Sequence, residues 1–185
     1  MAPIALSTMK EIVEQSYSKS PKRQIGSFEL IADSPTLVFY KSGNQIVVGI
    51  RGTQDDRDVE ADAMALQNNL SKSHRYNQDV EFFKKVQKQY EGQYIGVGHS
   101  LGAAILDCLI SDGYIKNGLS YNGLVEPKNL YHNPKHRRLY NSGDILYNLF
   151  GRFIPGVEVI KGSPFRKLDP TYYSLLYNHS LESFN

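Results

Sequence analysis

The chain has 185 residues, of which 41% are hydrophobic and 22% are charged, and its formal net charge at pH 7 is +2. These fractions are ordinary for a globular protein and exclude a disordered or fibrous chain. The length falls within the range of one folding unit, so we expect a single domain over residues 1–185. Because no strong basic excess is present, nucleic acid is not an expected partner.

No targeting segment or membrane span is expected. The N-terminal stretch MAPIALSTMK has too few apolar residues for a secretory signal, and no apolar window reaches the length of a transmembrane helix. The chain as written is therefore expected to be soluble and intracellular. Its single cysteine, Cys108, excludes an internal disulfide and lies in an apolar run, which predicts a buried and unreactive thiol.

The first half of the chain alternates between helix and strand patterns. Apolar residues recur at helical spacing from Ile4 to Val13 and predict an amphipathic helix. Three runs rich in β-forming residues, separated by turn residues, then predict a meander of strands at 28–31, 36–40 and 45–50. Two further amphipathic patterns predict helices at 55–70 and 74–90.

The second half opens with a strand, a tight turn and a helix. A short apolar run at 94–97 leads into Gly-His-Ser-Leu-Gly at 98–102, and the apolar stretch 103–110 predicts a buried helix. Beyond Gly113 the patterns are shorter and are strand-like or ambiguous, at 119–124, 138–140, 145–149 and 157–160. No internal repeat or linker divides the chain.

Ser100 is the candidate nucleophile. Residues 98–102 fit G-x-S-x-G, the nucleophile elbow, in which glycines permit a sharp turn between a strand and a helix. Three fixed positions are weak by themselves, but the predicted strand before and helix after them are the context that this motif requires. The alternative interpretation is a glycine-lined turn with a serine that caps the helix.

A serine nucleophile needs an imidazole base that is itself held by a carboxylate. The chain order Ser, acid, His restricts the base to His132, His136 or His179, because His74 comes too early and His99 lies inside the elbow. The polar, basic stretch around His132 and His136 is typical of a solvated loop. We therefore predict His179, near the C-terminus, as the base, with a structural or exposed histidine as the alternative.

The acid has six candidates, which are Asp107, Asp112, Glu126, Asp144, Glu158 and Asp169. Asp107 and Asp112 fall on or at the end of the helix after the elbow and are poorly placed. Asp144 follows a short predicted strand through Asn-Ser-Gly, which places it where the sites of open α/β sheets lie. We predict Asp144 as the acid, and Glu126 and Asp169 remain alternatives.

The oxyanion of an acyl-transfer intermediate needs two fixed N–H donors. Leu101, directly after the nucleophile, supplies the first. The strand at 45–50 continues into Arg-Gly-Thr at 51–53, where a glycine permits close backbone approach and Thr53 can offer its amide and its hydroxyl. The alternative for this tripeptide is a simple turn at the end of a strand.

These residues resemble the class 3 lipase family, the fungal-lipase-like branch of the α/β-hydrolases. The resemblance rests on four ordered places, which are 47–53, 98–104, 141–145 and His179, and it spans about residues 45 to 180. It implies that Thr53 belongs to the oxyanion hole, Ser100 is the nucleophile, Asp144 is the triad carboxylate and His179 is the base. It also implies a compact α/β fold of the α/β-hydrolase type, with a central, mostly parallel sheet flanked by helices.

The chain departs from the family pattern in two places. Gly-Ala-Ala stands at 102–104 where members often carry Gly-Gly-Ala, and the Gly-x-Pro-Arg-Val-Gly stretch that usually precedes the acid is absent. The predicted helix after Thr53 corresponds to the family's lid. Its start is acidic and its apolar stripe modest, so a lid and a core-packing helix both remain open, and a lid this acidic should disfavour anionic membranes.

The sequence thus predicts a serine esterase or lipase that uses no cofactor and no metal. Small-molecule or lipid esters are the expected substrates, with acylglycerols or phospholipids implied by the resemblance, and peripheral contact with a lipid surface is compatible with that function. An acyltransferase that uses the same nucleophile remains open. So does a catalytically silent protein that uses the fold for binding.

Overall fold

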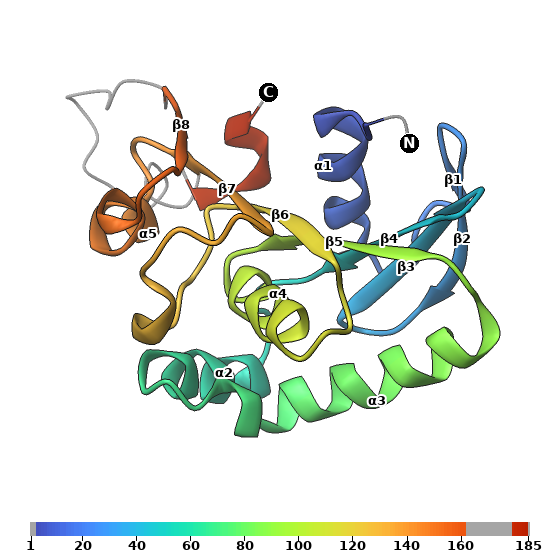
Figure 1. Cartoon of the computed structure of the whole chain (residues 1–185), viewed down its shortest axis with the longest axis horizontal. Coiled ribbons are helices and arrows are strands. Elements are labelled where there is room, and N and C mark those ends of the chain that lie inside the picture. Colours follow the sequence, from blue (N-terminus) through green and yellow to red (C-terminus); the bar gives the residue numbers. More distant parts are fainter. Residues whose placement is uncertain (1–2, 162–178, 185) are drawn as a thin grey trace.

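The structure is a computed structural model and describes residues 3–161 and 179–184 (Figure 1). Its centre is one eight-stranded sheet in the order β1-β2-β3-β4-β5-β6-β7-β8. The strands are β1 (Gln24–Ile25), β2 (Phe28–Asp33), β3 (Leu37–Ser42), β4 (Gln45–Ile50), β5 (Gln93–His99), β6 (Asn117–Tyr121), β7 (His136–Asn141) and β8 (Glu158–Ile160).

The first four strands are antiparallel neighbours, and β4 to β8 run parallel. The helices are α1 (Leu6–Gln15), α2 (Asp56–Leu66), α3 (His74–Gln89), α4 (Leu101–Ser111) and α5 (Ile145–Leu149). This arrangement confirms the expected α/β fold, with a central, mostly parallel sheet between helices.

The helices cover the sheet from two sides (Figure 1). Right-handed crossovers that advance in one direction along a sheet place their helices on a single face. Accordingly α2, α3 and α4 lie together on one face, whereas α1 and the C-terminal turn η4 (Leu181–Phe184) lie on the other. β4 is buried on both faces, since Ile46 and Val48 enter the cluster beneath α4 while Val47 packs with α1.

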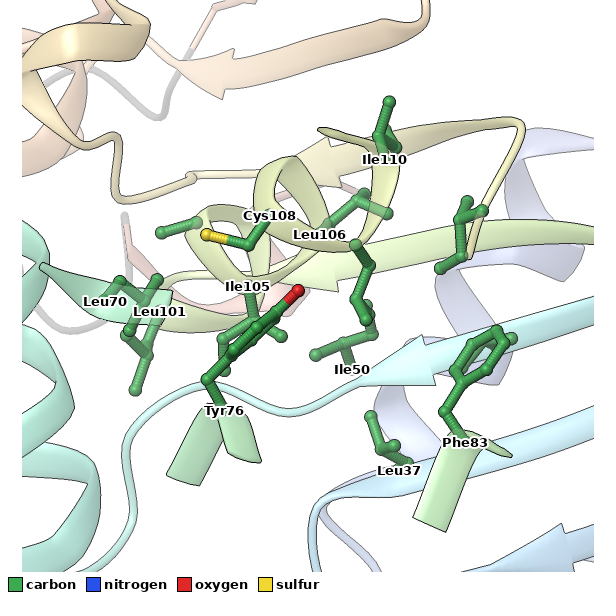
Figure 2. Packing of buried hydrophobic residues seen from close by; sticks show 14 of the residues in the cluster. Leu37, Ile50, Leu70, Tyr76, Phe83, Leu101, Ile105, Leu106, Cys108 and Ile110 are labelled. Atoms are coloured by element: carbon green, nitrogen blue, oxygen red, sulfur yellow. The ribbon is translucent and has the colours of Figure 1, made fainter. Parts of the chain in front are cut away.

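The larger apolar layer lies between the sheet, α3 and α4. The residues of α4 from Leu101 to Ile110 are all buried, and apolar ones among them, such as Leu101 and Ile105, form one cluster with Phe83 and Tyr76 of α3 (Figure 2). Cys108 lies in this layer and is buried as expected. Burial, followed by the nearby carboxylate of Glu126, raises the pKa of the Cys108 thiol, so the thiol stays protonated.

Several predicted boundaries differ from the observed ones. The helix predicted at 55–70 ends at Leu66, because Asn68 adopts a left-handed conformation with φ of 60°, and a separate turn η1 (Leu70–Lys72) follows. The ambiguous run 145–149 is the helix α5, capped by Asp144. The short pair of residues in β1 was not predicted. Among the residues described, no helix has both the length and the apolar character that a membrane span requires.

Candidate active site

Ser100 occupies a strained turn between β5 and α4. Its backbone has φ of 54° and ψ of −124°, a region that residues other than glycine rarely adopt and that is found at nucleophile elbows. A Cβ atom on Gly98 would lie 2.5 Å from the carbonyl oxygen of Gly102, and one on Gly102 would overlap the carbonyl oxygen of Ile50. Both glycines of the motif are therefore sterically required.

The Ser100 side chain faces a histidine. Its Oγ lies 2.9 Å from Nε2 of His179, and Nδ1 of His179 lies 2.6 Å from Oδ2 of Asp144. Ser100 makes no capping hydrogen bond to α4, every residue of which is described, and this removes the helix-cap interpretation. Because an ionised carboxylate only accepts, Nδ1 carries the proton and Nε2 accepts from the serine hydroxyl, which is the direction that base catalysis requires.

Asp144 is held by the start of α5. The carboxyl group is fully buried, and its Oδ1 accepts from the backbone N–H of Leu146 at 2.8 Å and of Tyr147 at 3.0 Å. One carboxylate oxygen thus caps the helix while the other faces His179. The cap fixes the rotamer of Asp144 and thereby the position of the oxygen that the imidazole meets.

The parallel strands explain why distant residues meet. β4, β5 and β7 run in the same direction, so their C-terminal ends lie at one edge of the sheet. Ser100 directly follows β5, Asp144 comes shortly after β7, and the 51–53 loop follows β4.

The loop after β4 passes close to the elbow. A Cβ atom on Gly52 would lie 2.9 Å from both the Cβ of Ser100 and the carbonyl oxygen of His99, so only glycine permits this approach. Leu101 is the first residue of α4, where backbone N–H groups lack intrahelical acceptors. Both backbone segments expected to supply oxyanion donors therefore border Ser100.

The hydroxyl of Thr53 differs from the expectation. It donates to Oδ2 of Asp62 in α2 at 2.7 Å, so it is engaged by a carboxylate rather than directed to an oxyanion. Burial raises the pKa of Asp62, and the hydrogen bond from Thr53 offsets part of that rise. The predicted contribution of Thr53 accordingly rests on its backbone N–H.

A buried ionic cluster anchors the same loop. Asp58 of α2 accepts from Nη2 of Arg51 at 2.7 Å and from the backbone N–H of Gln54 at 2.8 Å, and it also pairs with Arg75 of α3. Nη2 of Arg75 donates to the carbonyl oxygen of Arg51 at 2.9 Å. The first turn of α2 is thus tied to the loop after β4 and to α3. These contacts favour the core-packing helix over a lid.

A second Ser–His–Asp arrangement lies inside the protein. Nε2 of His136 is 2.9 Å from Oγ of Ser120, and its Nδ1 is 2.6 Å from Oδ1 of Asp107, which also pairs with Arg138. Ser120, His136 and Asp107 are 0%, 4% and 2% exposed, so no substrate reaches them. The expectation of a solvated loop at His136 was wrong, because this residue begins β7 and its ring is paired in the core.

The other candidates lie elsewhere. His132 is exposed in a loop, as expected. Glu126 is fully buried and accepts from the backbone N–H of Leu70. Asp112 accepts from the hydroxyl of Tyr76, and the exposed Glu158 pairs with Arg137.

Asp169 falls outside the described residues. Among the acidic candidates that are described, Asp144 is the one whose carboxylate bonds to His179. Within residues 3–161 and 179–184 no group of three or more His, Cys, Asp or Glu side chains is arranged to hold a metal ion.

Sequence patterns did not indicate two contacts behind the site. Nδ2 of Asn122 donates to the carbonyl oxygen of His179 at 3.1 Å, and the hydroxyl of Tyr17 meets the backbone N–H of Gly52 at 2.8 Å. Asn122 follows β6 and has φ of 44°, a conformation that asparagine tolerates better than most residues. That preference is the one local signal that could have singled it out.

Comparison with known proteins finds a structural likeness to a lipase, without a sequence match. No family model matches the chain, and no curated protein matches it. The crystal structure of the Lip2 lipase from Yarrowia lipolytica is similar at 16% sequence identity, over 77% of this chain and 72% of the lipase chain, with a TM-score of 0.46. At this degree of likeness, the lipase structure carries no argument about the function of this chain.

Proposed function

We propose that this protein is a serine hydrolase that cleaves carboxylic esters through an acyl-enzyme on Ser100. The observation that carries the proposal is the hydrogen-bonded series from Ser100 through His179 to Asp144, which begins at a serine in the strained conformation of a nucleophile elbow. The proposal assigns Ser100, His179 and Asp144 to nucleophile, base and orienting acid.

The mechanism follows from this geometry. Oγ of Ser100 attacks the ester carbonyl carbon while Nε2 of His179 takes the hydroxyl proton, and the resulting imidazolium faces Asp144. The backbone N–H groups of Leu101 and Thr53 stabilise the oxyanion. The alcohol leaves with a proton from His179. A water molecule, deprotonated by the same nitrogen, then attacks the acyl-enzyme and releases the acid and Ser100.

Lipid-like esters are the substrates we propose. The resemblance to class 3 lipases supports this substrate class. Exposed apolar side chains on α2, the helix that carries Asp62, and on α5, the helix that Asp144 caps, support it too. On α2 these side chains are Val59 and Leu66, and on α5 they are Ile145 and Leu149. Exposed apolar groups on helices that border a polar site suit a substrate with an acyl chain. Acylglycerols and phospholipids both meet this description.

The test is release of p-nitrophenol from acetate, octanoate and palmitate esters. We expect Ser100→Ala to lower kcat by at least about 10³-fold, as removal of the nucleophile does in serine hydrolases. Ser120→Ala is the matched control, because it removes the same atom from the buried Ser–His–Asp arrangement, and it should retain activity. Equal rates for wild type and Ser100→Ala, or no turnover of any ester, would overturn the proposal.

A further inference from the structure

Two side chains connect the oxyanion loop to the main chain of His179 without touching Ser100 Oγ. Tyr17, just after α1, has its hydroxyl oxygen 2.8 Å from the backbone nitrogen of Gly52 and 2.6 Å from Nδ1 of His99. Nε2 of His99 in turn lies 2.8 Å from the carbonyl oxygen of His179. Gly52 is thus linked to His179 through three successive hydrogen bonds.

The chemistry of the partners fixes the direction of each bond. A carbonyl oxygen only accepts, so Nε2 of His99 carries the proton and donates to His179. Burial, together with the neighbouring His179, lowers the pKa of His99 to about 3, so the ring is neutral and its Nδ1 accepts. The Tyr17 hydroxyl therefore donates to His99, and its oxygen accepts from the N–H of Gly52.

The position of His99 in the strand explains how it reaches this partner. Successive side chains of a strand point to opposite faces, and His99 is the last residue of β5, directly before the nucleophile. Its ring packs edge-on against Tyr17, with centroids 5.8 Å apart, and lies 5.0 Å from the His179 ring. The hydrogen bond from Asn122 is a second restraint on the same carbonyl oxygen of His179.

We propose that Tyr17 and His99 are positioning residues that fix the spacing between the oxyanion loop and the base His179. This inference rests on the proposed esterase function. The oxyanion donors and Nε2 of His179 must all lie within hydrogen-bonding distance of one tetrahedral intermediate, which forms when Ser100 Oγ bonds to the ester carbon. Small displacements of such groups reduce the rate strongly. His99, which occupies the first variable position of Gly-x-Ser-x-Gly, is therefore a positioning residue in this chain.

Tyr17→Phe is the diagnostic variant, because it removes one oxygen and both of its hydrogen bonds. Tyr40→Phe is the matched control, since the Tyr40 hydroxyl donates to the carbonyl oxygen of Lys22 at 2.6 Å and its ring packs on the same face of the sheet. With a short soluble ester we expect Tyr17→Phe to lower kcat about five- to tenfold at unchanged KM. Tyr40→Phe should lower the melting temperature and leave kcat unchanged.

Nitrogen NMR of the histidine rings gives a readout that does not need turnover. In the wild type we expect His99 to be neutral and protonated at Nε2 from pH 5 to 8, and its Nδ1 resonance to shift in Tyr17→Phe but not in Tyr40→Phe. A His99 protonated at Nδ1, or equal kcat for Tyr17→Phe and wild type, would overturn the inference. An inactive wild type with the expected His99 spectra would instead contradict the esterase function and leave the connection intact as a structural one.

Discussion

Asp144 meets His179 with one carboxylate oxygen, at 2.6 Å from Nδ1, while its other oxygen caps α5. The acid of the proposed triad is therefore positioned by a helix that begins directly after it. A single buried side chain both starts a local element and orients a histidine that lies far along the chain.

Because the Asp144 carboxylate both caps α5 and faces His179, Asp144→Asn should affect stability and catalysis differently. The amide oxygen can still accept from the N–H groups of α5, so the melting temperature should change little. The charge facing His179 is lost and the histidine tautomer is no longer fixed, so we expect kcat to fall by about 10³- to 10⁴-fold. Steady-state kinetics and thermal unfolding of Asp144→Asn, beside Asp112→Asn as the control, measure both effects. Wild-type kcat in Asp144→Asn would contradict the assigned role.

Ala103 stands where class 3 lipases often carry glycine, and its methyl group packs against Gly123. A Cβ atom on Gly123 would lie 2.5 Å from the Cβ of Ala103, so the alanine methyl occupies space that Gly123 leaves open. We expect Gly123→Ala to destabilise the protein by about 1–3 kcal/mol through overpacking. Ala103→Gly in the same chain should restore part of this loss. Urea unfolding of the two single variants and the double variant tests the coupling, and strictly additive effects would contradict it.

Local sequence patterns were sufficient to predict elements whose neighbours in the fold also follow them directly in the sequence. The strand β4, the strand–turn–helix around Ser100 and the loop that carries Asp144 were all predicted from short windows, because their apolar periods and turn residues are local. The same windows missed the first residue of β7, although they predicted the strand-like run at 138–140 within it. His136 was predicted to lie in a solvated loop, and its pairing with Asp107 is what makes burial of its ring favourable.

Contacts between distant segments were not predictable in this way. Tyr17 lies 35 residues before Gly52 and 82 before His99, and no periodicity relates the three. The hydroxyl of Thr53 is a second example. The sequence suggested that it could donate to the oxyanion, but in the fold it donates to Asp62, which no local pattern indicated.

The neutral state of His99 makes stability depend on pH. The pKa of His99 is about 3 in the folded protein, against a reference value of 6.5. Between these values the unfolded chain binds one more proton at this residue, so the free energy of unfolding should fall as the pH is lowered from 6.5, by roughly 1 kcal/mol per pH unit. Urea unfolding from pH 4.5 to 7.5 should show a shallower dependence in His99→Gln.

The exposed histidine His74 supplies the control for that series, and His74→Gln should keep the wild-type dependence on pH. Parallel curves for wild type and His99→Gln would show that His99 is protonated equally in the folded and unfolded chain, contrary to its buried, neutral state.

The ionic cluster beneath the oxyanion loop should be sensitive to its central carboxylate. Asp58→Asn leaves the guanidinium groups of Arg51 and Arg75 without that charge, and we expect a loss of about 3–5 kcal/mol in the free energy of unfolding. Asp56→Asn changes an exposed residue in the same turn of α2 and should alter the free energy by less than about 0.5 kcal/mol. Equal stabilities of the two variants would show that the cluster does not hold the loop.

The central claim is that Ser100 is an activated nucleophile, and covalent labelling tests it most directly. An alkyl fluorophosphonate reacts when a serine oxygen attacks phosphorus, fluoride leaves and the hydroxyl proton passes to the base. Peptide mapping by mass spectrometry should find the adduct on Ser100 in the wild type and on no serine in Ser100→Ala, with Ser120 unlabelled in both. An unlabelled Ser100, or labelling that persists in Ser100→Ala, would contradict the account.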